Sequence, residues 1–325
     1  MDRIKHTYGK GNIDYSKDEF IVICLVKDGE TFIDAFIRYY LNLGAKHIFF
    51  IDNQSADKTV DMIKQHNNTS IYSTDLPFKD YECEIRRTLI RHLSKDRWCL
   101  CVDIDELFDY PYSDRISMVQ FLRYLDKNRF TAVVAYMLDM FSKKPLSHLT
   151  DVENLDLEKT FCYYDISNIT KEEYPLKHLY ISHGNKNNLS NKEIKFYWGG
   201  IRRTFFGKDT HFFLIKHPLL FIDTKIEPFT HPHFSNNADI ADVTCLLRHY
   251  KINKSLPGRS KEIVKKQDQP YYAQKEYQMY YDAFQKDQSL SLFTENSKKF
   301  RKVNELIDNG FLTISKQFID YVSKT

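Results

Sequence analysis

The chain has 325 residues with 47 basic and 44 acidic side chains, so its net charge is only +3. This balance argues against the domain-wide basic surface of a nucleic-acid-binding protein. Hydrophobic residues make up 42% of the chain, and 10 glycines and 9 prolines are too few for a collagen-like or disordered polypeptide. We therefore expect a globular protein of one large domain or two.

Three features of the sequence bear on its compartment. The N-terminal residues 1–19 are polar and lack the apolar segment of a secretory signal, and we expect them to form a loosely ordered lead. The longest apolar runs, such as Phe20 to Val26, are far too short to cross a bilayer. Six cysteines without the paired spacing of a zinc site predict buried free thiols. We expect a cytoplasmic protein, with peripheral contact to the inner face of the membrane left open.

Strand-like and helix-like patterns alternate over the first 140 residues. Apolar, β-branched runs predict strands covered on both faces, and apolar residues at helical spacing predict the helices between them. In chain order we expect a strand at 20–26, a helix at 30–43, a strand at 46–51, a helix at 56–66, a strand at 70–73, a helix at 80–94, a strand at 97–102, a helix at 116–126 and a strand at 130–138. This alternation predicts an α/β fold with a mostly parallel sheet.

Polar clusters follow three of the predicted strands. They are Lys27-Asp28-Gly29-Glu30, Asp52-Asn53-Gln54-Ser55 and Asp103-Ile104-Asp105-Glu106. Ligands of such sheets bind outside the carboxyl ends of the strands, so we expect the three clusters to share one pocket. Successive side chains of a strand point to opposite faces, so we expect Asp103 and Asp105 to share one face at the end of the strand. Two carboxylates there suit Mg²⁺ or Mn²⁺, which usually also binds phosphates of a substrate.

The pattern changes after about residue 141. Residues 142–195 are polar and aperiodic, which indicates loops and short strands, interpreted here as surrounding an acceptor site. Further strands are expected at 212–215, 219–222 and 242–249, and the chain reads as helical from Lys261 onward. The predicted division is a polar lead (1–19), a nucleotide-sugar-binding half (20–140), an acceptor-binding half (141–255) and a helical C-terminal extension (256–325).

The tyrosine-dense stretch 271–284 has three interpretations. It is a helix that packs against the core, a wall on which sugars stack, or an element that touches a membrane or a lipid-linked acceptor. Core packing is the default, because aromatic side chains at helical spacing usually face the interior.

In this order, the three polar clusters resemble family-2 glycosyltransferases with a GT-A fold. The similarity is to a bacterial subgroup that begins near C-x-V-K-N-E and carries D-N-x-S-x-D-x-T and D-I-D-E-F. The matching segments here are CLVKDGE at 24–30, DNQSADKT at 52–59 and DIDEL at 103–107, with similar later pieces at 138–141, 199–203, 216–219 and 246–251. The resemblance covers residues 20–255. It implies a Rossmann-like, mostly parallel sheet flanked by helices.

The resemblance also implies a nucleotide-sugar donor, UDP-linked in the first place, bound together with Mn²⁺ or Mg²⁺. The implied metal ligands are Asp103, Asp105 and His249, with His231 and His233 as competitors for the histidine position. The residues implied to bind the donor come from the strand-end clusters and from cations of the second half: Val26, Lys27, Asp28, Glu30, Asp52, Asn53, Asp103, Ile104, Arg202, Arg203 and Lys251. Ordinary surface charge is the alternative for the last three.

Asp139 is the candidate general base. It interrupts the apolar stretch 133–141, where a charge is costly unless it is paired or used. At the end of a neighbouring strand it would face the hydroxyl of an acceptor. The alternative is a structural partner for an arginine or a backbone amide.

These features predict a metal-dependent glycosyltransferase that moves a sugar from a nucleoside-diphosphate sugar to a glycan. Surface polysaccharide or lipooligosaccharide precursors, including lipid-linked ones, are the acceptors we expect, and inversion is implied by the family alone. One rival is a sugar-phosphate nucleotidyltransferase, which would normally show a glycine-rich basic loop after the first strand. The other is a catalytically silent glycan-binding protein on the same fold.

Overall fold

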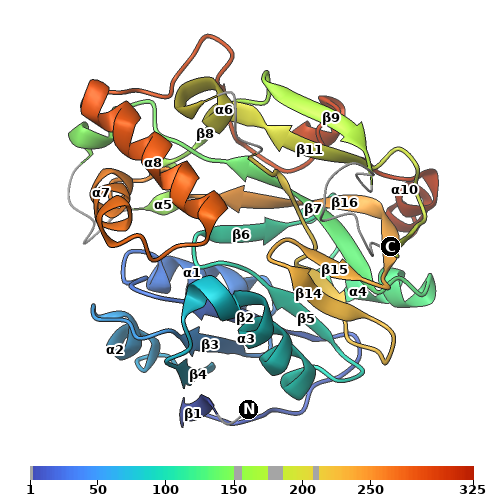
Figure 1. The fold of residues 1–325 in the computed structure, drawn as a ribbon. Helices are drawn as coiled ribbons and strands as arrows, with labels where there is room; N and C mark the ends of the chain where they lie inside the picture. Colours follow the sequence, from blue (N-terminus) through green and yellow to red (C-terminus); the bar gives the residue numbers. More distant parts are fainter. Residues whose placement is uncertain (1–2, 150–155, 175–185, 208–211) are drawn as a thin grey trace.

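The computed structural model describes residues 3–149, 156–174, 186–207 and 212–325. A large mixed sheet crosses the molecule in the order β1-β4-β3-β2-β5-β13-β7-β16-β10, with β12 paired to β7 and β6 paired to β16 (Figure 1). Helices lie against it, so the fold is α/β with a large, largely parallel central sheet, as predicted.

The strands of the large sheet are β1 (Ile4–Tyr8), β2 (Phe20–Val26), β3 (Ile48–Asp52), β4 (Thr69–Thr74), β5 (Trp98–Cys101), β6 (Glu106–Asp109), β7 (Ala132–Asp139), β10 (Asn188–Leu189), β12 (Ile215–Lys216), β13 (Leu219–Phe221) and β16 (Asp239–His249). Three small two-stranded sheets are formed by β9 (Ile169–Glu173) with β11 (Lys195–Gly199), β14 (Glu227–His231) with β15 (Phe234–Asn236), and β8 (Tyr163–Tyr164) with β17 (Lys298–Lys299).

The helices are α1 (Ile33–Asn42), α2 (Thr59–Ile63), α3 (Phe78–Leu93), α4 (Met118–Lys127), α5 (Leu157–Thr160), α6 (Gly200–Phe206), α7 (Leu256–Lys266), α8 (Tyr271–Lys286), α9 (Glu305–Asp308) and α10 (Lys316–Val322), with a 3₁₀ turn at Leu146–His148. Figure 1 draws α7 and α8 on the same side of the molecule as α1 and α2, which follow the carboxyl ends of β2 and β3.

The N-terminal half of the sheet is parallel. β5, β2, β3 and β4 run side by side in the same direction, and every residue of β2 is buried. The apolar sequence of β2 explains this, because a strand covered on both faces needs apolar side chains at successive positions. Their carboxyl ends therefore meet at one edge of the sheet.

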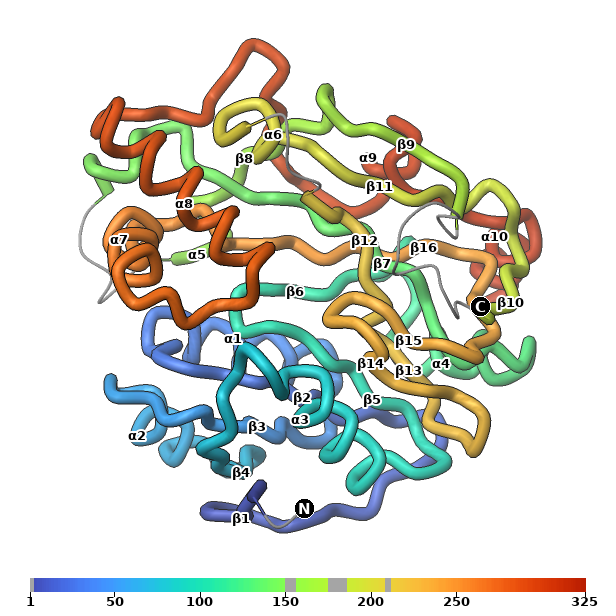
Figure 2. Tube along the Cα trace, viewed as in Figure 1, coloured from blue at the N-terminus to red at the C-terminus, as the bar shows by residue number. Residues whose placement is uncertain are grey.

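The C-terminal half of the sheet brings distant segments together. β13 lies antiparallel between β5 and β7, and β16 runs parallel to β7 (Figure 2). After β5 the chain turns and returns as β6, which pairs antiparallel with β16. In this register His249 lies opposite both Glu106 and Asp139. The turn that holds the acidic cluster thus abuts the ends of β7 and β16.

Two expectations need correction. Residues 1–19 are not a loosely ordered lead throughout, because β1 pairs antiparallel with β4 as an edge strand. Its side chains are mostly exposed, so the sequence carries little apolar signal for it. The helix expected at 56–66 is shorter, since α2 spans Thr59–Ile63. The stretch 142–195 contains short strands as expected, although 150–155 and 175–185 lie outside the described residues.

The tyrosine-dense stretch forms α8. Tyr277, Tyr280 and Phe284 are buried, as the core-packing interpretation predicts, whereas Tyr271 and Tyr272 are 73% and 61% exposed. In the described part of the chain, no helix combines the length and the apolar character that crossing a bilayer requires.

Candidate functional site

The loops after β2 and β5 contact each other at the carboxyl edge of the sheet. A Cβ atom added at Gly29 would lie 2.7 Å from Cγ2 of Val26 and 3.2 Å from Cγ1 of Ile104. Only a residue without a side chain fits between them, since real Cβ atoms do not approach so closely. The predicted convergence of these two clusters is therefore present in the fold.

The loops after β2 and β3 are joined by reciprocal hydrogen bonds. The backbone N–H of Asp28 donates to Oγ of Ser55 at 2.9 Å, and Oδ1 of Asp28 accepts from the N–H of Ala56 at 2.7 Å. One turn later, the N–H of Glu30 donates to Asp57 at 3.0 Å, and the Glu30 carboxylate accepts from the N–H of Lys58 at 3.1 Å. Asp28 and Glu30 thus hold the two loops together, and their roles in donor binding stay predictions.

The remaining residues of these two clusters divide between buried and exposed positions. Asp52 is buried, and its Oδ1 accepts from the N–H of Ser55 at 3.2 Å. Asn53 is also buried and donates to the carbonyl groups of Thr74 and Leu76. These bonds give both side chains a structural role in the turn. Lys27 is exposed at the same edge.

Asp103 lies between two buried cations. Its Oδ1 accepts from Arg86 of α3 at 2.6 Å and its Oδ2 accepts from Lys216 of β12 at 2.9 Å. Burial alone would raise the pKa of Asp103, but Arg86 and Lys216 outweigh it and hold that pKa well below its usual range. The side chain is still 37% exposed, so an ionised carboxylate of fixed orientation remains open to a ligand.

Glu106 is the inward-facing acid of the cluster. It is fully buried, and both of its oxygens accept from Lys216, at 3.0 and 2.8 Å. Its carboxylate also accepts from the N–H of Asp103 at 2.8 Å, which closes the turn. Burial raises the pKa of Glu106, and the charge of Lys216 only partly offsets this. Glu106 therefore anchors the loop and has no free oxygen for a ligand.

Asp105 has a different environment. β5 ends at Cys101, so Asp103 and Asp105 stand in a turn and do not share one strand face as expected. Oδ2 of Asp105 lies 3.7 Å from Nε2 of His249, and Nδ1 of His249 is 2.7 Å from Oδ1 of Asp139. A carboxylate on one ring nitrogen fixes the tautomer and orientation of the imidazole, an arrangement common around metal-bound histidines.

Asp139 is buried and both of its oxygens have partners. Besides His249, it accepts from Nε of Arg202 at 2.8 Å. Burial would raise the pKa of Asp139, but Arg202 and the bond to His249 outweigh it, and the pKa is lowered. These contacts favour a role in orienting His249. The general-base role of Asp139 stays a prediction.

A second carboxylate continues this chain of contacts into α8. Glu276 accepts from Nη1 of Arg202 at 3.3 Å, from Lys251 at 2.7 Å and from the hydroxyl of Tyr280. Burial would raise the pKa of Glu276, yet Lys251 and Arg202 lower it strongly. Arg202 and Lys251, both predicted to bind phosphate, therefore have protein partners.

Arg203, His231 and His233 contact other residues than Asp105, although Nδ1 of His233 is 2.8 Å from the carbonyl oxygen of Ile215, beside Lys216. The guanidinium of Arg203 lies 4.7 Å over the ring of Trp198 and donates to Thr170. His231 and His233 pack against Phe213 and Phe234, with their ring centroids 5.8 Å apart. His249 is the predicted histidine whose Nε2 lies close to Asp105, at 3.7 Å from its Oδ2.

The sequence reasoning missed four residues of this site. Arg86 sits on the apolar face of α3 beside Ile85 and Leu89, and this misplaced charge was a readable signal. Lys216 ends an apolar strand within a piece already noted for its resemblance. Glu276 lies within the tyrosine-dense stretch 271–284, which was interpreted only through its aromatic residues. Arg259 of α7 is exposed and stacks 5.5 Å over Tyr277.

Arg259 differs from the other cations of the site. Within the described residues its guanidinium makes no ion pair, whereas Arg86, Arg202, Lys216 and Lys251 all do. Tyr277 raises the pKa of Arg259, with smaller contributions from the carboxylates of Asp105, Asp103 and Asp28. A free guanidinium therefore lies within electrostatic reach of the acidic strand ends.

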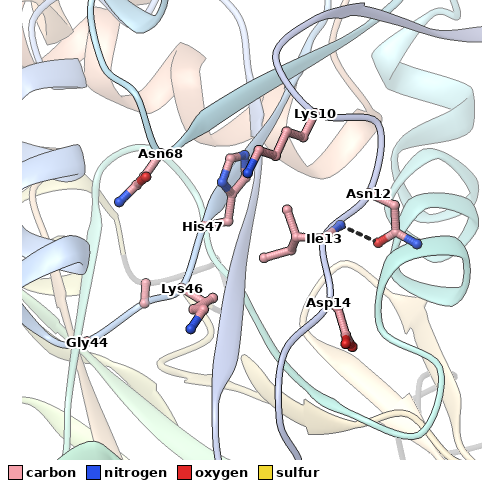
Figure 3. Close-up of a pocket in the computed structure, with 9 residues that line it drawn as sticks. Lys10, Asn12, Ile13, Asp14, Gly44, Lys46, His47 and Asn68 are labelled. Carbon is pink, nitrogen blue, oxygen red and sulfur yellow. Dashed lines mark hydrogen bonds between the residues drawn. The ribbon is translucent and has the colours of Figure 1, made fainter.

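A cavity of about 620 Å³ opens at the other edge of the sheet. Its lining comes from residues that precede β3 and β4 and from the segment after β1, including Lys10, Lys46, His47 and Asn68 (Figure 3). Lys46 pairs with Glu19 at 2.9 Å, and burial and Lys10 lower the pKa of His47 to about 4. No predicted site residue lines this cavity.

Comparisons with known proteins add little. No family model matches the chain, and no curated protein matches it. Among solved structures, a nucleotidyl transferase from Methanothermobacter thermautotroptrophicus is similar at 10% identity and a TM-score of 0.23, over 39% of this chain. The chain spans 63% of that structure. A likeness this weak bears on neither the fold nor the function.

Asp105 and His249 are the residues at the strand ends that could contribute to a metal site. Asp105 offers a carboxylate, which suits Mg²⁺ or Mn²⁺, and His249 offers an oriented imidazole, which suits transition-metal ions. Within the described residues, no group of three or more acidic, histidine or cysteine side chains could hold a metal by itself. The remaining ligands would have to be oxygens of a substrate or of water.

Proposed function

We propose that this chain is a metal-dependent glycosyltransferase of the GT-A type that uses a nucleoside-diphosphate sugar. The observation that carries the proposal is the geometry around Asp105: its carboxylate lies 3.7 Å from Nε2 of His249, whose other nitrogen is held by Asp139. Two ligands at the carboxyl edge of an α/β sheet suit a cation whose coordination a diphosphate completes.

Each residue has a distinct task in this proposal. A bound Mn²⁺ or Mg²⁺ would act as a Lewis acid on the diphosphate leaving group. Asp105 and His249 would hold the cation. Asp103, ionised and oriented by Arg86 and Lys216, would accept hydrogen bonds from the ribose hydroxyls of the donor. Arg259 would bind the diphosphate, because a guanidinium fork matches phosphate oxygens.

The test is calorimetric titration of UDP, GDP and CMP into the protein, with and without Mn²⁺. We expect one nucleotide to bind tightly only with Mn²⁺, and we expect Asp105→Ala to lose that dependence. A folded wild-type protein that binds none of them would contradict the proposal and favour a glycan-binding protein. Where one nucleotide does bind, donors that carry different sugars on that nucleotide are compared next. Release of the nucleoside diphosphate then identifies the substrate.

A nucleotidyltransferase is the alternative within the same fold class. It would bind a nucleoside triphosphate, transfer its nucleoside monophosphate group to a sugar phosphate and release pyrophosphate. The loop after β2 argues against it, because Asp28 and Glu30 place carboxylates where a triphosphate-binding loop would need glycine and basic residues. Release of pyrophosphate from a triphosphate and a sugar phosphate would favour this alternative.

A further inference from the structure

Positive charge is concentrated in α7, the residue Lys254 before it, and the start of α8. Residues 254–275 contain six cationic side chains and two acidic ones, Glu262 and Asp268, which gives this segment a net charge of +4. The whole chain has a net charge of +3, so the rest of the molecule is slightly negative. A positive segment on a protein that is otherwise near neutral points to a negatively charged partner.

Two exposed tyrosines lie at the tip of the hairpin formed by α7 and α8. α7 ends at Lys266 and α8 begins at Tyr271, so a four-residue turn brings Lys265 and Lys266 close to Tyr271 and Tyr272. The two tyrosine side chains are 73% and 61% exposed, the highest values among the large hydrophobic residues that the structure describes. Lys275 follows Tyr271 by one helical turn and shares its face.

Contacts between α7 and α8 fix the position of this tip. Nε2 of Gln274 donates to the carbonyl of Ile263 at 3.1 Å and so joins the two helices. Ile263 and Tyr277 are buried between them and the core. Lys261, Lys265 and Lys275 are exposed, and no ion pair from them occurs within the described residues, whereas Lys266 lies 3.6 Å from Glu262. Lys261, Lys265 and Lys275 are therefore available to a partner.

We propose that the tip of this hairpin, residues 265–275, docks on the surface of an anionic lipid bilayer. Each lysine near such a surface contributes about 1 kcal/mol of attraction. Tyrosine is suited to the headgroup layer, because its ring is apolar and its hydroxyl remains in contact with water. The described residues contain no helix that could cross the bilayer, so this contact is peripheral.

Two observations favour a bilayer over a glycan as the occupant. The rings of Tyr271 and Tyr272 are inclined at 75° to each other, with centroids 5.6 Å apart, so they do not form one flat platform for successive sugar rings. Lysines of both helices lie near them in the sequence, Lys265 and Lys266 at the end of α7 and Lys275 in α8, which matches a charged plane better than a single narrow chain. The stretch 298–302 serves as a control segment for the docking experiment. It also carries four cations but has no exposed large aromatic side chain.

The test is co-sedimentation of the full chain with vesicles of phosphatidylcholine, alone or mixed with phosphatidylglycerol, at low and high salt. We expect binding to the anionic vesicles at low salt and none to the neutral ones. Lys265→Gln with Lys266→Gln should weaken binding about 30-fold, since two charges are removed. Tyr271→Ser with Tyr272→Ser keeps the charge and should still weaken binding. Lys298→Gln with Lys299→Gln is the matched control and should change little.

Three results would overturn the proposal: no vesicle binding by the wild-type protein, equal binding to neutral and anionic vesicles, or an equal loss in the Lys298/Lys299 control. Capture by a soluble acidic polysaccharide without vesicle binding would assign the tip to glycans and also overturn it. All substituted side chains are exposed, so the unfolding temperature should not change. Nucleotide binding is measured separately, so failure here leaves the proposed function intact.

Discussion

Asp103 and Asp105 are two residues apart and yet lie in opposite electrostatic environments. Asp103 forms ion pairs with two buried cations, Arg86 and Lys216. Lys216 also forms an ion pair with the nearby Glu106. Asp105 faces a histidine that Asp139 orients. In the first environment cations anchor the buried Glu106 and hold Asp103 ionised and partly exposed, whereas the second places a carboxylate beside an imidazole. Under the proposed function, one acidic motif thus contains a structural anchor, Glu106, and a ligand for a cation, Asp105.

The largest expected effect comes from removing the cation of the first environment. Lys216→Met leaves Glu106 buried without its partner, and we expect a loss of about 3–5 kcal/mol in the free energy of unfolding. Urea denaturation measures it. Lys46→Met is the control, because Lys46 forms an exposed pair with Glu19 and should cost no more than about 1 kcal/mol. Equal losses in the two variants would contradict the role of Lys216 as the buried partner of Glu106.

The second environment is tested by Asp139→Asn. If Asp139 orients His249, this variant should bind Mn²⁺ about 10–100-fold more weakly in the presence of nucleotide. Competition between Mn²⁺ and a coloured chelator measures the affinity. Asp126→Asn is a suitable control, because Asp126 accepts from Nε1 of Trp98, which begins β5 at the edge of the sheet opposite the site. If Asp139 is instead the general base, transfer would be lost while Mn²⁺ affinity stays unchanged.

A smaller effect concerns Arg259, which makes no ion pair within the described residues. We expect Arg259→Gln to weaken binding of a nucleoside diphosphate about 10-fold or more, because a charged hydrogen bond to phosphate is lost. Binding of the nucleoside without phosphates should not change. Lys261→Gln, exposed on the same helix, controls for general charge. An equal effect of both substitutions would show that Arg259 has no specific role.

A further effect, gradual in size, is a dependence of stability on pH. His217 is fully buried with its Nε2 2.7 Å from the hydroxyl of Tyr174, and burial lowers its pKa to about 3. Between the ordinary pKa of 6.5 and about 3, the unfolded chain binds a proton that the folded chain does not. Stability from this group is therefore complete above pH 6.5 and falls by about 1.4 kcal/mol per pH unit below it.

His217→Asn should reduce the change of the free energy of unfolding with pH by the contribution of one proton, about 1.4 kcal/mol per pH unit. Urea denaturation at several pH values between 7 and 4 measures it, and His47 and His231, whose pKa values are also lowered to about 4, account for part of the remainder. An unchanged slope would mean that His217 is protonated in the folded protein.

The parallel half of the fold was predictable from local pattern. Apolar strands such as Phe20–Val26 and the helices between them are encoded in short windows of sequence, and the topology of a parallel sheet then places the polar clusters at one edge. β1 was not predictable, because an exposed edge strand has little apolar periodicity. Its pairing with β4 depends on a distant segment.

The charged contacts of the site were harder to predict for a similar reason. Arg86, Lys216 and Glu276 lie 17, 113 and 173 positions from Asp103 in the sequence. Only the folded chain brings Arg86 and Lys216 into contact with Asp103. The strand-face argument for Asp103 and Asp105 failed because β5 ends at Cys101. A single misplaced charge, such as Arg86 on an apolar helix face, was the one local signal.

The central claim is that Asp105 and Asp103 act differently, and one titration tests it directly. UDP is titrated into wild type, Asp103→Asn and Asp105→Asn, each with and without Mn²⁺. We predict that Asp105→Asn loses the gain in affinity that Mn²⁺ provides, whereas Asp103→Asn binds UDP more weakly and keeps that gain. Equal loss of the Mn²⁺-dependent gain in both variants, or its retention in both, would contradict the account.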